Sequence, residues 1–262
     1  MKNAPASEKK NTDILSADAI KSLLPEDFSG DIIVLETTES TNQDAAKIVK
    51  TAPHGTTILA DAQTAGRGRL GRSFFAPSGG IYMSLILRLN LAFSDAVLIT
   101  TAASVAVCKA VEAVSSVRPQ IKWVNDILVD GKKVCGISCE AVSAGETIDA
   151  VILGIGINFS AQEFPKELQD TAGVLFSKPP ISRNVLTAEI LKNLLEETKD
   201  LSSRKFIEDY RMRSAVIGKP IRYLEAGVWH EAKADGIDEN GGLVILENEL
   251  SRTLVSGSAT LR

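Results

Sequence analysis

Histidine and cysteine are scarce, because the chain of 262 residues contains only two histidines and three cysteines. The histidines, His54 and His230, give no Ser-His-Asp arrangement, so we do not expect catalysis centred on a histidine base. The cysteines are Cys108, Cys135 and Cys139. An odd number at these spacings makes no disulfide framework and indicates buried thiols in a reducing cytoplasm. Because so few nitrogen and sulfur ligands are present, we expect neither zinc nor haem.

A long apolar run and a strong charge of one sign are also missing. We expect no segment to cross a membrane, and residues 1–11 are too polar for a signal sequence and should form a disordered tail. The 29 basic and 33 acidic residues give a net charge of −4. No overall positive field therefore favours nucleic acid, and any phosphate binding must come from a local cluster of cations.

What remains is an ordinary globular composition, with 44% hydrophobic residues. The spacing of these hydrophobic residues along the chain predicts an α+β fold. The expected strands cover residues 31–35, 56–60, 81–89, 121–129, 133–142 and 148–158. The expected helices cover residues 16–24, 43–50, 94–114, 162–169, 183–198 and 203–213. Short strands then follow at residues 220–224, 228–237, 243–247 and 250–255. We therefore predict a tail and short helix at 1–28, a main domain at 29–217 and a small β-barrel at 218–262.

One loop is dense in glycine and arginine and reads Gly66-Arg67-Gly68-Arg69-Leu70-Gly71-Arg72-Ser73. It comes close to the dinucleotide fingerprint and to the P-loop, but both patterns need a helix directly afterwards. Pro77, Gly79 and Gly80 follow instead, before an apolar strand, so we exclude both patterns and NAD with them. Three arginines within six positions predict binding of a phosphate or carboxylate. A solvated basic loop, or one that touches RNA, is the alternative.

Three further clusters have a plain interpretation as well as a functional one. They are Ser40-Thr41-Asn42, Lys122-Trp123-Val124-Asn125-Asp126 with Lys133 after it, and Gly154-Ile155-Gly156-Ile157-Asn158. The first can be only a helix cap, the second a turn with a solvated lysine, and the third a closely packed strand. Alternatively, Asp126 could hold Mg²⁺ and an asparagine could orient a ligand, because polar groups in an apolar hairpin need partners.

In their order and spacing these clusters closely resemble the biotin protein ligases, from about residue 30 to the C-terminus. The resemblance implies a mixed β-sheet with flanking helices, akin to the core of class II aminoacyl-tRNA synthetases, and a small SH3-like barrel at the C-terminus. Some members carry an N-terminal helix-turn-helix that represses biotin genes. The residues before the first expected strand are too few for such a domain, so the chain resembles the short form.

The resemblance also implies the activity of an ATP-dependent ligase. Such an enzyme forms biotinyl-5'-AMP and then transfers biotin to a lysine of a biotin carboxyl carrier protein or domain, as in acetyl-CoA carboxylase or another biotin-dependent carboxylase. ATP, Mg²⁺ and biotin are then expected, and the expected partner is a protein, with no nucleic acid and no membrane. A monomer and a homodimer are both compatible with the sequence.

The matched motifs imply a role for each residue. Biotin would contact Ser40, Thr41 and Asn42 through its ureido ring, with Gln63, Arg67, Gly68, Arg69, Lys133 and Gly136 around it. ATP would contact Arg69, Arg72, Phe74, Asn125, Asp126, Asn158 and Arg262, and Asp126 and Asn158 would hold Mg²⁺. The expected catalytic residues are Arg67, Arg69, Lys133 and Asp126.

The sequence departs from the family pattern at a few positions. Val124 replaces a common proline, Leu70 an arginine and Ser258 a glutamate of some members, and Phe74 stands where tryptophan is frequent. Val124 affects the orientation of the Asn125 side chain, and Leu70 and Ser258 affect the contacts of the loop and the barrel. None of these departures affects the expected reaction. Three alternatives stay open: a lipoate–protein ligase relative, a non-catalytic biotin sensor and a nucleic-acid-binding module.

Overall fold

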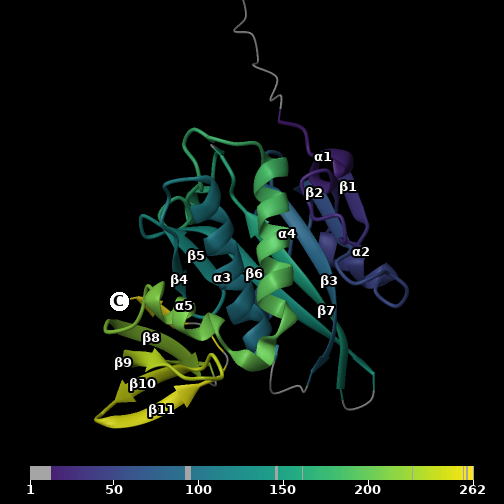
Figure 1. Ribbon diagram of the computed structural model, residues 1–262. Helices are drawn as coiled ribbons and strands as arrows, with labels where there is room; N and C mark the ends of the chain where they lie inside the picture. The colour runs from purple at the N-terminus through teal and green to yellow at the C-terminus, as the bar shows by residue number, and fades with distance from the viewer. Residues whose placement is uncertain are drawn as a thin grey trace, which may run out of the picture.

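The computed structural model describes residues 13–91, 96–144, 147–160, 162–225, 227–255, 257 and 259–261 (Figure 1). Its main sheet has seven strands in the order β1-β2-β3-β7-β6-β5-β4. They are β1 (Ile32–Thr38), β2 (Thr57–Gln63), β3 (Ile81–Leu91), β4 (Gln120–Lys122), β5 (Asp126–Val129), β6 (Lys132–Ala144) and β7 (Thr147–Ile157). Only β1 and β2 pair in parallel, and the other neighbours pair antiparallel. The expected mixed sheet is therefore confirmed.

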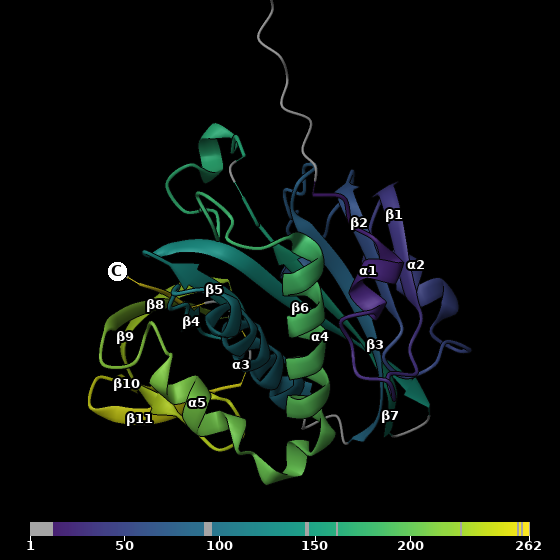
Figure 2. The same cartoon turned by 45° about the horizontal axis from the view of Figure 1, so that its top comes forward.

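Alternating side chains divide the sheet into two faces with separate apolar clusters. Leu85 and Leu87 belong to the large core shared with α3 (Ala96–Val114) and α4 (Arg183–Lys199). Ile86, which lies between them, belongs to the cluster under α2 (Thr41–Ile48). Figure 2 shows α3 and α4 side by side over one face of the sheet. Because strand side chains alternate, α2 covers the opposite face, toward which Ser84 and Ile86 both point.

Helix α3 forms where the sequence predicts a helix, and it is apolar along most of its length. Its segment Val97–Val114 is long and apolar enough to cross a bilayer, but 72% of that segment is buried inside the protein. Ala102, Ala106 and Ala110 are fully buried. A helix that is apolar on most sides is the expected result of packing between a sheet and a second helix.

The expected strand at 121–129 is instead a hairpin of β4 and β5, in which Lys122 pairs with Asp126. The turn spans residues 123–125, and its Trp123–Val124 peptide is cis. Asn125 fastens this turn to β6, because its Nδ2 donates to the Ile137 carbonyl over 2.7 Å. A polar residue within an apolar run therefore marks a chain reversal here.

The helix expected at 162–169 is also wrong, because the structure contains only a 3₁₀ turn there, Lys166–Leu168. Pro165 accounts for the difference. It disfavours helical backbone at the preceding residue and has no N–H for a helical hydrogen bond.

The second sheet is antiparallel, in the order β11-β10-β9-β8-β12. Its strands are β8 (Pro220–Glu225), β9 (Val228–Ile237), β10 (Leu243–Glu247), β11 (Leu250–Leu254) and β12 (Ala259–Leu261), the last of which was not expected. Two hydrogen bonds join the second sheet to the main domain. Trp123 Nε1 of the β4–β5 turn donates to the Gly241 carbonyl over 3.0 Å. Arg211 Nε of α5 (Phe206–Met212) donates to the Ile237 carbonyl over 2.8 Å. The small sheet therefore packs against the β4–β5 turn, as its size requires.

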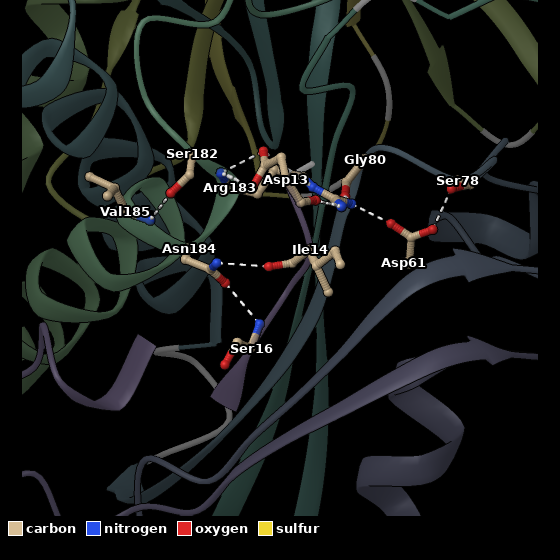
Figure 3. Close-up of polar contacts among 10 residues, drawn as sticks. All are labelled: Asp13, Ile14, Ser16, Asp61, Ser78, Gly80, Ser182, Arg183, Asn184 and Val185. Atoms are coloured by element: carbon tan, nitrogen blue, oxygen red, sulfur yellow. Dashed lines mark hydrogen bonds and ion pairs between the residues drawn. The ribbon is translucent and has the colours of Figure 1, made fainter. Parts of the chain in front are cut away.

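A buried arginine ties the segment before α1 (Ala17–Lys21) to the start of α4 (Figure 3). The guanidinium of Arg183, which is 3% exposed, bonds to the Asp61 carboxylate on β2 and to the backbone carbonyls of Gly80 and Asp13. It also lies 3.6 Å from the Asp13 carboxylate. Burial opposes ionisation of Asp61, but hydrogen bonds from Ser78 and Arg183 outweigh burial and lower its pKa. The buried cation is thus neutralised by two carboxylates.

Replacing this cation should destabilise the fold. We expect Arg183→Met to lower the free energy of unfolding by about 3 kcal/mol, because Asp61 and Asp13 would lose their buried counter-charge. Denaturant unfolding near neutral pH measures the effect. Lys192→Met on the same helix is the matched control, since its ion pair with Glu189 is partly exposed and should contribute less than about 1 kcal/mol. Equal losses in the two variants would contradict this role of Arg183.

Candidate active site

Two rows of mostly small residues cross the sheet on the face that carries α2. Ser84, Gly154 and Ser138 are paired across β3, β7 and β6. In the next row, Gly156 and Gly136 are small, but their partner on β3 is the large side chain of Tyr82. A Cβ on Gly154 would lie 2.4 Å from Asn42 Oδ1, and one on Gly156 would lie 2.6 Å from the Phe74 ring. The two glycines therefore let Asn42 and Phe74 approach the sheet closely, and both side chains line a cavity above it.

One wall of this cavity carries uncharged hydrogen-bonding groups. Ser40, Thr41 and Asn42 are buried at the start of α2. The Thr41 N–H donates to Gln63 Oε1 over 2.8 Å, and Ser84 Oγ lies 2.6 Å from Asn42 Oδ1. Ser40 is the N-cap residue of α2, but its side chain makes no capping hydrogen bond. A helix cap is therefore an incomplete account of these residues, which form a wall suited to a small neutral polar ring.

Charged side chains gather where the cavity continues toward the β4–β5 turn. Lys133 Nζ lies 2.6 Å from Asp126 Oδ1, and Lys122 Nζ lies 3.5 Å from Asp126 Oδ2. Lys133 Nζ is also 5.9 Å from the centre of the Phe74 ring. Two ammonium groups beside one carboxylate leave this region net positive, which suits phosphate or carboxylate oxygens.

Arg69 connects the glycine–arginine loop to the same turn. Its Nη1 donates to Asn125 Oδ1 over 3.2 Å, and burial lowers its pKa, although an arginine remains a cation in proteins. Arg69, Asn125 and Lys133 line both the cavity and an adjoining hollow, which reaches Gly257 of the small barrel region. The neutral wall and the cationic hollow are thus parts of one continuous site.

The glycine–arginine loop is a hairpin closed by backbone hydrogen bonds, rather than an open loop with free N–H groups. The Gly68 N–H donates to the Arg72 carbonyl over 2.7 Å, and the Phe74 N–H donates to the Gly66 carbonyl over 2.8 Å. A Cβ on Gly66 would lie 2.6 Å from the Phe74 carbonyl oxygen, so glycine is needed there for the close crossing. The Gly68 amide is therefore engaged within the loop, whereas the side chains of Arg67 and Arg69 line the cavity.

Most of the residues implied by the family resemblance meet at this site. The cavity is lined by Ser40, Thr41, Asn42, Gln63, Arg67, Gly68, Arg69, Phe74, Asn125, Lys133 and Gly136, and the adjoining hollow adds Arg72 and Asp126. Asn158 lines neither, and its Nδ2 donates to the Gly173 carbonyl over 2.9 Å. Arg262 and Ser258 lie outside the described residues.

The two expected magnesium ligands do not line the same hollow, because Asp126 lines the adjoining hollow and Asn158 lines neither. Both oxygens of Asp126 face lysines, and Asn158 Oδ1 is buried away from the two hollows, without a hydrogen-bond partner among the described residues. Among those residues, no three histidine, cysteine or acidic side chains are grouped to hold a metal. The assignment of magnesium to Asp126 and Asn158 therefore stays a prediction.

Three polar residues that contact Asn42 of the neutral wall were missed by the sequence analysis. Glu140 Oε1 accepts from Asn42 Nδ2 over 2.6 Å, Ser138 Oγ lies 3.3 Å from the same nitrogen, and Ser84 is fully buried beside Asn42. The available signal was a lone serine in the apolar run of β3 and a polar pair two residues apart on β6. Only the strand register connects these positions to Asn42.

The mixed sheet and its two hollows are built mostly from residues 34–158, and these residues match the model of the Biotin/lipoate A/B protein ligase family. The chain is 35% identical over 239 residues to the bifunctional ligase/repressor BirA of Bacillus subtilis, covering 87% of this chain and 72% of that protein. It is 31% identical over 229 residues to the biotin–[acetyl-CoA-carboxylase] ligase of Mycobacterium tuberculosis, covering 81% and 82%. The solved biotin protein ligase from Aquifex aeolicus, in complex with biotin and ATP, matches with a TM-score of 0.76 at 29% identity, covering 90% of this chain and 99% of that one. The chain belongs to the biotin protein ligases.

Proposed function

We propose that this protein forms biotinyl-5'-AMP from biotin and ATP and transfers biotin to a lysine of a biotin carboxyl carrier protein or domain. One observation carries the proposal: the neutral wall and the cationic hollow join at Lys133 and Arg69. Biotin is divided in the same way, with a neutral cyclic urea at one end and a carboxylate at the other. The urea would lie against residues 40–42, and the carboxylate would reach Lys133 beside the phosphates of ATP.

In the first step, a biotin carboxylate oxygen attacks the α-phosphorus of ATP. A phosphorus–oxygen bond forms, the bond to the β-phosphate oxygen breaks, and pyrophosphate leaves. Both reactants are anions, so Lys133 and Arg69 would lower their repulsion and stabilise the charge of the transition state. Asp126 would hold the Lys133 ammonium in position. No general base is needed, because the carboxylate is already ionised at neutral pH.

In the second step, the amine of the acceptor lysine attacks the acyl carbon of biotinyl-5'-AMP. A carbon–nitrogen bond forms and AMP leaves with the oxygen of the mixed anhydride. The amine loses a proton, and Asp126 is the carboxylate of the hollow that could accept it. The anhydride is destroyed if water reaches it, so the loop of residues 66–74 would serve to cover it.

The direct test is to incubate the protein with biotin, MgATP and an acceptor domain, and to measure the mass of the acceptor. We expect the mass to rise by one biotinyl group, with pyrophosphate released at the same time. Lipoate offered in place of biotin should give neither product. Transfer of lipoate without transfer of biotin would overturn the proposal in favour of lipoate ligation.

A substitution at the floor of the cavity separates the biotin region from the ATP region. Gly154→Ala places a Cβ 2.4 Å from Asn42 Oδ1 and 2.5 Å from Ser138 Oγ. We expect the KM for biotin to rise about tenfold or more, with little change in the KM for ATP, because the clash falls on the neutral wall. Gly236→Ala is the control, because a Cβ there has no neighbour within 4 Å. An unchanged KM for biotin would show that this wall is not the biotin site.

A further inference from the structure

A chain of hydrogen bonds runs through the neutral wall, from a carboxylate on β6 to the start of α2. Asn42 Nδ2 donates to Glu140 Oε1 over 2.6 Å and lies 3.3 Å from Ser138 Oγ. On the other side of the amide, Asn42 Oδ1 lies 2.6 Å from Ser84 Oγ, which in turn lies 2.7 Å from Thr41 Oγ1. The chain therefore links an anionic group to two side chains of the cavity wall, Asn42 and Thr41.

The carboxylate gives this chain a direction. Glu140 can only accept, so the Asn42 amide must turn its nitrogen toward Glu140 and its oxygen toward Ser84. Since Asn42 Oδ1 only accepts, the Ser84 hydroxyl must donate to it. Ser84 has one proton, and it therefore accepts from the Thr41 hydroxyl. The Thr41 hydroxyl has two oxygens within reach, Gln63 Oε1 at 3.1 Å and Ser84 Oγ at 2.7 Å. The hydrogen-bond chain assigns its single proton to the shorter contact, toward Ser84 and Asn42.

The consequence concerns what the wall presents to a ligand. With their protons committed inside the chain, the side-chain oxygens of Asn42 and Thr41 keep only lone pairs for a molecule in the cavity. We propose that Glu140 and Ser84 are positioning residues that fix Asn42 and Thr41 as hydrogen-bond acceptors, which selects a ring with N–H donors. The inference rests on the proposed function, in which that ring is the cyclic urea of biotin.

The same arrangement would disfavour rings without donors. The dithiolane of lipoate has no N–H group, so it would leave the buried oxygens of Asn42 and Thr41 unpaired, and sites built from hydrogen-bonding groups reject ligands that cannot satisfy them. The proposed selectivity thus originates on β3 and β6, in side chains that need not touch the ligand.

Glu140→Gln tests the direction of the hydrogen bonds between Glu140 and Thr41. Glutamine keeps the length and can still accept from Asn42, but its amide can also donate, so the Asn42 amide is free to reverse. We expect the dissociation constant for biotin, measured by calorimetry, to rise about fivefold, with that for ATP unchanged. Ser84→Ala, which interrupts the chain without altering charge, should have a similar effect on biotin alone. Glu36→Gln is the matched control, because Glu36 is, like Glu140, an exposed carboxylate on a strand of the same sheet, and it does not line the cavity.

Cyclic carbamate analogues of biotin, in which one ring N–H is replaced by oxygen, give the decisive measurement. In the wild type, the analogue whose new oxygen faces Asn42 should bind on the order of 100-fold more weakly than biotin, because acceptor then meets acceptor. In Glu140→Gln that penalty should fall about tenfold, because Asn42 can reverse and donate.

Three outcomes are distinguishable. An equal carbamate penalty in wild type and Glu140→Gln would overturn the inference while the proposed ligase activity stands. Equal weakening of biotin and ATP binding would mean that Glu140 only supports the fold, and this too would overturn the inference. Failure of the wild type to bind biotin at all would overturn the proposed function, and the inference with it.

Discussion

Lys133→Gln is expected to lower the rate of adenylate formation by on the order of 10²- to 10³-fold, the loss typical of removing one transition-state charge contact. The ammonium of Lys133 lies where the neutral and cationic parts of the site join, 2.6 Å from Asp126. Glutamine is polar and only one bond shorter, but it carries no charge, so it cannot neutralise the carboxylate and the α-phosphate as they meet. Pyrophosphate release with saturating biotin and ATP measures the effect.

The adjacent residue provides the control for this prediction. Lys132 Nζ donates to the Gln169 carbonyl over 3.0 Å and does not line the site. Lys132→Gln removes the same charge one position away and should leave the rate within about twofold, as expected of an exposed surface group. If the two variants lost activity equally, the effect would reflect net charge rather than contact with the reacting groups, and the assignment of Lys133 would be wrong.

The sequence located most of the site because its motifs occur at loops and strand ends. Lys133 lies next to the Asp130-Gly131 turn, and Arg67 and Arg69 lie in a glycine-rich loop, where polar and charged residues stand out against apolar flanks. Element types followed from periodicity for the same reason, since long apolar strands and α3 have unambiguous patterns.

The neutral wall could not be assembled from the sequence in the same way. Ser84 and Ser138 become neighbours of Gly154 only through the pairing of β3 and β6 with β7. Register depends on contacts between strands distant in sequence, and a shift of one residue would send every side chain to the other face. A closely packed strand was one of the two interpretations of residues 154–158, but the sequence did not indicate that the groups packed against Gly154 and Gly156 are Asn42 of α2 and Phe74 of the loop.

Arg69→Gly is expected to shorten the lifetime of bound biotinyl-5'-AMP by on the order of 100-fold, and to cause labelling of bystander proteins. Arg69 lies in the 3₁₀ turn Arg69–Gly71 and fastens the loop to the β4–β5 turn through its bond to Asn125. Glycine removes both this bond and a partly buried cation beside the phosphate, and it adds backbone freedom to the loop. Gel filtration of the loaded protein, followed by assay of retained adenylate, measures the lifetime.

Two further variants decide whether the Arg69–Asn125 bond is responsible. Arg72→Gly removes an exposed arginine from the same hairpin and adds the same backbone freedom, yet it leaves that bond intact. It should weaken ATP binding but retain an adenylate already formed. Asn125→Ala breaks the bond from the opposite side and should release the adenylate as Arg69→Gly does. Both glycine variants make the hairpin more flexible, but only Arg69→Gly removes its hydrogen bond to the β4–β5 turn. If Arg72→Gly released the adenylate equally, the stiffness of the loop rather than the Arg69–Asn125 bond would retain the intermediate.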